Sequence, residues 1–188
     1  MKKVALLAAM VLAAPSVGLA KKDPCAILKV ESDPFSGQSV VSTTFAYMRS
    51  EGSDWRTALG PWTVSAGPSG IGLVVKAYYR VIKDTTIPAD SEFQFMMSDS
   101  SILSLKTSSS VNSDTIVGSD AAYGVVGLPL TLTPDDLKKL STVYPTHIRG
   151  DFGFGVETIE IIQTDVEKKL PVAAACLAQI LAAPTSAP

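Results

Sequence analysis

The sequence has little of what most metal sites and nucleophilic enzymes are built from. Its 188 residues include one histidine, His147, and two cysteines, Cys25 and Cys176. One histidine and two cysteines far apart in the chain do not make a usual tetrahedral zinc site. The nucleophile motif G-x-S-x-G is also missing, because Ile71 stands where its last glycine is needed. We therefore expect no metal and no cofactor.

Basic clusters are missing as well, and so are long apolar segments beyond the N-terminal region. The chain carries 16 basic and 18 acidic side chains, a formal net charge of −2. Slight acidity without a basic cluster argues against nucleic acid as a partner. No later segment approaches the roughly 20 apolar residues that a membrane-spanning helix needs. The composition thus favours a protein without a membrane span once its leader is removed.

The first twenty residues have the pattern of a secretory signal peptide. Lys2 and Lys3 give a positive start, and Val4–Ala14 is an apolar run. Gly18 and Ala20 are small residues at positions −3 and −1 of a cleavage site after Ala20. Losing the two lysines leaves 14 basic against 18 acidic side chains, a net charge of −4. We expect a periplasmic or secreted protein of the bacterial envelope or exterior.

The two cysteines lie near the two ends of the mature chain. Export places them in an oxidising compartment, where thiols pair. We predict that Cys25 and Cys176 form a disulfide that ties the first strand to the last helix. Closing a loop of about 150 residues stabilises a fold by roughly 5 kcal/mol at most in the chain-entropy account. Two buried free thiols are the alternative.

The clearest local signal is a short helix within Leu132–Leu140, LTPDDLKKL. Thr133 is a good N-cap, because its hydroxyl can accept a hydrogen bond from a first-turn amide. Pro134 would occupy the first helical position, where its missing N–H costs nothing. Leu132 and Leu137 have the spacing of a hydrophobic staple. This helix marks topology and carries no chemistry of its own.

Alternating apolar residues predict strands over most of the remaining chain. Ala26–Glu31 reads as a half-buried strand, and Ile71–Ile82 is the longest strand candidate. Ile71–Ile82 should face the core with Leu73, Val75, Ala77, Tyr79 and Val81. The cleanest hairpin has the buried alternation Phe93, Phe95, Met97 before its turn and Ile102–Lys106 after it.

Two stretches read as irregular. Arg49–Gly70 contains several glycines, and we interpret it as a long surface connection with a short strand at Trp62–Ser65. Thr107–Ser119 is rich in serine and predicts a mobile loop. Near the C-terminus, Thr164 with Glu167 predicts a capping box for a terminal helix.

These signals add up to an α+β fold. We expect a β-rich antiparallel sheet or sandwich of about seven to nine strands, with one short helix and a C-terminal helix packed on the sheet. The domain would span residues 21–181, after the signal peptide at 1–20. A disordered tail would occupy residues 182–188.

The sharpest polar constellation follows the short helix. His147, Arg149 and Asp151 alternate along an extended segment, so they should share one face, with Ile148 pointing inward. Asp151 joins them only if Gly150 does not reverse the chain. A histidine and a carboxylate beside an arginine could bind an anion or move a proton. A solvated strand edge with a local ion pair is the plainer alternative.

The aromatic residues Trp55, Trp62 and Tyr78 form a second candidate, because they could provide a stacking platform for a sugar or a peptide. The two tryptophans lie in the glycine-rich stretch. They could equally fold back as a small local core, the commoner use of tryptophan in such loops. Calcium is also conceivable on the acidic loop that carries Asn112, Asp114 and Asp120.

No motif is specific enough to name a family. The leading hypothesis is a non-enzymatic binding or interaction module that recognises a protein, a peptide or a glycan. The alternative is a secreted hydrolase that uses His147 and Asp151 with an unidentified serine. A purely structural or inhibitory domain is the third possibility.

Overall fold

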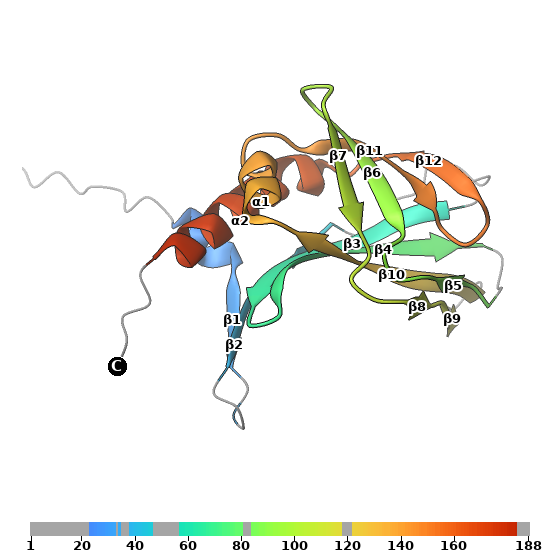
Figure 1. The fold of residues 1–188 in the computed structure, drawn as a ribbon, viewed down its shortest axis with the longest axis horizontal. Helices are drawn as coiled ribbons and strands as arrows, with labels where there is room; N and C mark the ends of the chain where they lie inside the picture. Colours follow the sequence, from blue (N-terminus) through green and yellow to red (C-terminus); the bar gives the residue numbers. More distant parts are fainter. Residues whose placement is uncertain are drawn as a thin grey trace, which may run out of the picture.

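The computed structural model describes residues 23–183 apart from 33, 35–37, 47–56, 81–83 and 118–121. The fold is α+β and mostly antiparallel sheet, as the sequence predicts. Within the described residues, twelve strands form a six-stranded sheet, a four-stranded sheet and a small two-stranded ribbon. Figure 1 shows the strands of the four-stranded sheet running across those of the larger, curled sheet.

The six-stranded sheet has the strand order β1-β2-β3-β4-β10-β9. Its strands are β1 (Lys29–Ser32), β2 (Ser39–Phe45), β3 (Thr57–Gly67), β4 (Gly70–Tyr79), β10 (Ala122–Leu132) and β9 (Asp114–Val117). The four-stranded sheet has the order β12-β11-β6-β7. Its strands are β12 (Val156–Glu160), β11 (Pro145–Asp151), β6 (Glu92–Met97) and β7 (Ile102–Lys106). The ribbon pairs β5 (Thr86–Ile87) with β8 (Val111–Asn112).

The core lies between the inner faces of the two main sheets. Alternation predicts it correctly: the inward residues of β4 and β6 are all buried, namely Leu73, Val75, Ala77, Tyr79, Phe93, Phe95 and Met97. Trp62 of β3 meets Phe95 of β6 edge to face, with ring centroids 6.2 Å apart. The Tyr79 hydroxyl donates a 2.8 Å hydrogen bond to the Phe152 carbonyl, which links β4 to the chain after β11. The sheets are therefore joined by aromatic packing and by a buried polar contact.

The short helix α1 (Pro134–Leu140) begins where the sequence predicts. The Asp136 amide donates to the Thr133 hydroxyl at 3.1 Å, and the Thr133 amide donates to the Asp136 carboxylate at 2.9 Å. This reciprocal pair is a capping box that satisfies two otherwise unpaired amides. Leu137 and Leu140 are buried against the core.

The C-terminal helix α2 (Thr164–Ala182) packs on β2 and β3 and against α1. Its predicted capping box is wrong. The N-cap is Gln163, and no side chain caps the helix. The Gln163 amide group instead turns into the core, where it bonds Trp62 and the carbonyls of Leu59 and Gly60. The helix continues as one element across Pro171.

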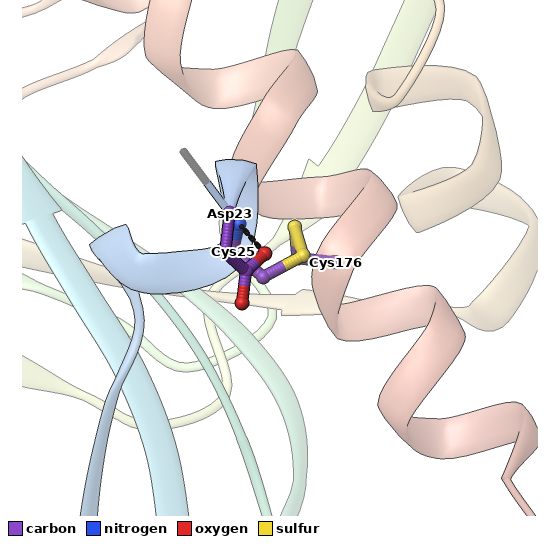
Figure 2. Close-up of a disulfide and its surroundings, with 3 residues drawn as sticks. All are labelled: Asp23, Cys25 and Cys176. Carbon is purple, nitrogen blue, oxygen red and sulfur yellow. Dashed lines mark hydrogen bonds between the residues drawn. A yellow bond between two sulfur atoms is a disulfide. The ribbon is translucent and has the colours of Figure 1, made fainter. Parts of the chain in front are cut away.

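The predicted disulfide is confirmed (Figure 2). Cys25 and Cys176 are bonded, with Cα atoms 5.6 Å apart and 151 positions apart in sequence. Cys25 lies in a 3-10 turn, η1 (Pro24–Ile27), rather than in the first strand. The Asp23 carboxylate accepts a 2.9 Å hydrogen bond from the Cys25 amide and so orders this turn. The bond anchors the chain just before β1 to the middle of α2.

The short strand predicted at Trp62–Ser65 is part of β3, but the surface connection predicted around it is wrong over residues 57–67. β3 has eleven residues, and from Gly60 onward its alternate residues are buried. Residues 49–56 lie outside the described part of the chain. The sequence did not indicate the full strand β3, because Gly60 and Pro61 are residue types that usually mark turns and loops. Gly60 lies under the Tyr78 ring, where a Cβ atom would collide with the ring. Pro61 sits where the register of β3 and β4 shifts, a position that needs no ladder N–H.

Two further expectations need correction. The predicted mobile loop over Thr107–Ser119 contains β8 and β9, and β9 pairs with the edge of β10. The predicted half-buried strand over Ala26–Glu31 begins later, at Lys29, and every residue of β1 is exposed. The signal peptide and most of the predicted tail lie outside the described residues.

Candidate functional site

The segment with the only histidine is a regular strand, so the predicted constellation exists as a row. β11 runs without reversal through Gly150, and its side chains alternate between the core and solvent. His147 is half-buried, Arg149 and Asp151 are exposed, and Ile148 is fully buried. Gly150 lies within the strand, and the Phe93 ring of the neighbouring strand covers it, leaving no room for a Cβ atom.

Neighbouring strands extend this row into a broad surface. Residues directly opposite in an antiparallel pair project to the same side. We define the outer face of the four-stranded sheet by the three rows that this register gives. The first row contains Glu160, His147, Met96 and Ile102, and the second contains Thr158, Arg149, Gln94 and Ser104. The third row contains two pairs, Val156 with Asp151 and Glu92 with Lys106.

Polar side chains occupy most of this outer face. The Gln94 amide donates a 3.1 Å hydrogen bond to the Glu92 carboxylate. Hydrogen bonds from Gln94 and Ser104 hold the pKa of Glu92 below its usual value. Arg149 makes no ion pair with any described residue. Arg149 is exposed in the middle row of the face, and its guanidinium carries five N–H donors.

The geometry separates His147 from Asp151. Four positions along a strand correspond to about 13 Å, too far for a hydrogen-bonded pair. The Asp151 carboxylate also has other partners: one of its oxygens accepts hydrogen bonds from the amides of Gly153 and Gly155 at 2.7 and 3.1 Å. The predicted His147–Asp151 pair is therefore not formed. The carboxylate across the ladder from His147 is Glu160.

Two members of the predicted aromatic platform are described: Trp62, which is buried, and Tyr78, which is half-buried with its ring over Gly60. Trp62 is 0% exposed, and its indole N–H donates to Gln163 at 2.8 Å. Its ring therefore offers no free face to a ligand, and the packing alternative describes it correctly. Trp55 lies outside the described residues, so its role stays a prediction.

Two hollows in the described surface lie away from the predicted residues. The larger, about 220 Å³, crosses the outer side of the six-stranded sheet over Ser65, Gly72 and Thr131. The smaller, about 140 Å³, lies beside Tyr144 and the start of α2.

Within the part of the chain that the structure describes, no three histidine, cysteine or acidic side chains gather to hold a metal ion. Of the suggested calcium ligands, Asn112 accepts a 2.8 Å hydrogen bond from Thr86, and Asp120 lies outside the described residues. No described helix is both long and apolar enough to cross a membrane.

Sequence reasoning predicted β11 and the β6–β7 hairpin, but it did not predict that these strands lie side by side in one sheet. The missing neighbours are Gln94, Ser104 and Thr158, which flank Arg149 in the middle row. The alternation of β6 and β7 already indicated that these side chains point away from the core. What the sequence did not contain is the strand order that places β6 and β12 on either side of β11.

Comparisons with known proteins identified no relative of this chain. No family model, curated protein or solved structure matches the chain. Inferences about function therefore rest on the geometry and chemistry of the chain itself.

Proposed function

We propose that the protein is a non-catalytic binding module of the bacterial envelope or exterior, periplasmic or secreted. Its partner is a protein, a peptide or a glycan, which it contacts through the outer face of the four-stranded sheet. The observation that carries the proposal is the middle row of this face, with Arg149 set between the polar side chains of Thr158 and Gln94.

Rigidity supports this assignment. The side chains of the face stand on paired strands whose opposite sides are locked into the core by Phe93, Phe95 and Ile148. A partner that binds there does not have to order a loop, which lowers the conformational cost of association. The donors of Arg149, the amide of Gln94 and the hydroxyl groups of Ser104 and Thr158 suit a partner rich in carbonyl, carboxylate or hydroxyl groups.

The proposed location rests on two features. The N-terminal residues have the charge and apolar pattern of an export signal. The Cys25–Cys176 bond is of a kind that persists in oxidising compartments and is rare in the reducing cytosol.

The hydrolase alternative has less support. It would need a base oriented by a carboxylate, and Asp151 lies too far along the strand to orient His147. A His147→Ala variant assayed on ester, peptide and glycan panels addresses this alternative directly. If the parent protein turns over a substrate and the variant does not, while its melting temperature is unchanged, the hydrolase hypothesis would replace the binding proposal.

Site-specific photocrosslinking tests the binding proposal. A photoreactive amino acid replaces Gln94, at the centre of the proposed face, and the protein is exposed to an envelope extract of the producing cells. We expect discrete adducts that disappear when Arg149→Glu is added. The matched control places the same group at Val74, on the outer side of the six-stranded sheet. Equal adducts at both positions, or none at Gln94, would reject the proposal.

A further inference from the structure

The six-stranded sheet ends in a strand that projects from the body of the protein. Figure 1 shows the β1–β2 hairpin extending away from the four-stranded sheet and from the helices. All four residues of β1 are exposed, and Val30 is 67% exposed. In the described part of the chain, β1 pairs with β2 on one side only. Its other edge presents backbone donors and acceptors, the feature by which exposed strands recruit another strand.

The sequence of β1, Lys29-Val30-Glu31-Ser32, is complementary to itself. When such a strand pairs antiparallel with a second copy about a two-fold axis at Val30, Lys29 stands opposite Glu31 of the second copy. Glu31 then stands opposite Lys29, and the two Val30 side chains meet at the centre. Opposite charges directly across an antiparallel pair stabilise it, whereas like charges destabilise it.

The alternative registers are disfavoured by the same residues. A shift by one position would place side chains of opposite faces against each other. A two-position shift, which keeps the faces matched, centres the axis on Glu31 or on Lys29. Each of those arrangements places like charges directly opposite each other. The charge pattern therefore selects a single register, the one centred on Val30.

Apolar side chains continue across the same axis. Val41 of β2 pairs with Val30, so both lie on one side of the sheet. In the paired arrangement, a row of four valines would run from one copy to the other. This would cover the exposed surface of Val30, for which the described residues provide little cover.

The other edge of the same sheet lacks this pattern. β9 is also fully exposed, with Val117 at 79% and Ile116 at 43%. Pairing β9 with itself while keeping faces matched places Asp114 against Ile116, or Thr115 against Val117. Neither arrangement contains an opposite-charge pair, so β9 serves as an internal control.

We propose that two copies of this chain associate by antiparallel pairing of β1 with β1, centred on Val30, to form a continuous sheet through both copies. Such isologous pairing closes on itself and gives a dimer rather than a filament. It uses a surface separate from the outer face of the four-stranded sheet. Its failure would therefore leave the proposed binding function untouched.

Charge exchange tests the register. Sedimentation velocity across a range of concentrations should show reversible dimers of the parent protein. Lys29→Glu and Glu31→Lys should each weaken dimerisation by about tenfold or more, because each creates two like-charge pairs. The double exchange should restore it, and an equimolar mixture of the two single variants should form heterodimers. Monomers at every concentration, or a double exchange as weak as the single variants, would overturn the proposal.

A cysteine at the axis gives an independent test. Val30→Cys should form a disulfide-linked dimer under mild oxidation, since the two β-carbons would lie about 5 Å apart. Peptide mapping must show that Cys25–Cys176 is retained. Val117→Cys, on the exposed edge strand β9, is the matched control and should crosslink much more slowly. Equal rates, or faster crosslinking at position 117, would reject the β1 interface.

Discussion

The outer sides of the two main sheets differ although both are antiparallel and both cover the same core. On the four-stranded sheet, long polar side chains such as Arg149, Gln94 and Glu160 project into solvent. On the six-stranded sheet, small residues such as Ser65 and Gly72 leave a hollow above the backbone. The outer side of the four-stranded sheet therefore carries projecting polar side chains, whereas the outer side of the six-stranded sheet contains a hollow.

The two sheets are also secured differently. The six-stranded sheet lies beside α2, which the Cys25–Cys176 bond ties to the turn before β1. The four-stranded sheet depends on packing, above all the Phe93 ring over Gly150 and its edge-to-face contact with Phe152, at a centroid distance of 5.3 Å. Covalent and packing constraints are thus divided between the sheets, and each can be removed separately.

The largest expected effect comes from removing the disulfide. A Cys25→Ser/Cys176→Ser variant should lose about 2–5 kcal/mol in its free energy of unfolding, because the open chain gains entropy when unfolded. Urea denaturation measures the loss. Native-state hydrogen exchange should accelerate most in β1 and β2 and least in β6 and β11. Uniform acceleration across both sheets would contradict the division of constraints.

A glycine pair tests packing on the two sheets. Gly150→Ala should cost about 1–3 kcal/mol, since its β-carbon would collide with the Phe93 ring. Gly72→Ala should have little effect, because the nearest atoms to its β-carbon would be 3.6 Å and 3.8 Å away. Urea midpoints of the two variants provide the comparison. Equal losses would show that the Phe93 ring does not restrict the side chain at position 150.

The hydrogen bond between the sheets should have a pH signature. Burial, followed by the nearby Glu157 and Asp151 carboxylates, raises the pKa of Tyr79 well above its usual value near 10. The folded protein therefore keeps this proton at a pH where the unfolded chain loses it. This contribution to stability is complete below pH 10 and falls as the pH rises above it.

Tyr79→Phe isolates this contribution. At pH 7 the variant should be less stable by about 1–3 kcal/mol, because the Phe152 carbonyl loses its donor. The difference from the parent should shrink above pH 10, where only the parent is penalised by ionisation of its unfolded state. Denaturation from pH 7 to 11 measures the gap, and a constant gap would contradict the raised pKa.

How far the sequence predicts the fold depends on which interactions define each element. The capping residues around Thr133 and the alternation of Phe93, Phe95 and Met97 are local, so α1 and the β6–β7 hairpin were predicted correctly. β3 was largely missed, because its glycine and proline are accommodated by Tyr78 and by a register shift with β4. These are long-range features that no local pattern contains.

The candidate site follows the same rule. The shared face of His147, Arg149 and Asp151 is a local property of an extended chain and was predicted. Its partners across the ladder depend on strand order, which the sequence did not provide. The sequence likewise contained no sign of the role of the Gln163 side chain, which accepts from the indole of Trp62 and donates to two carbonyls of β3.

We propose that the outer face of the four-stranded sheet is the binding surface. The most direct measurement compares two charge reversals, Arg149→Glu on this face and Lys76→Glu on the outer side of β4, in binding to the partner captured at Gln94. Both residues are exposed, so both variants should unfold within about 0.5 kcal/mol of the parent. We expect Arg149→Glu to lose at least tenfold (about 1.4 kcal/mol) in affinity for the partner, and Lys76→Glu to lose none. Equal affinities for the two variants, or a loss confined to Lys76→Glu, would contradict it.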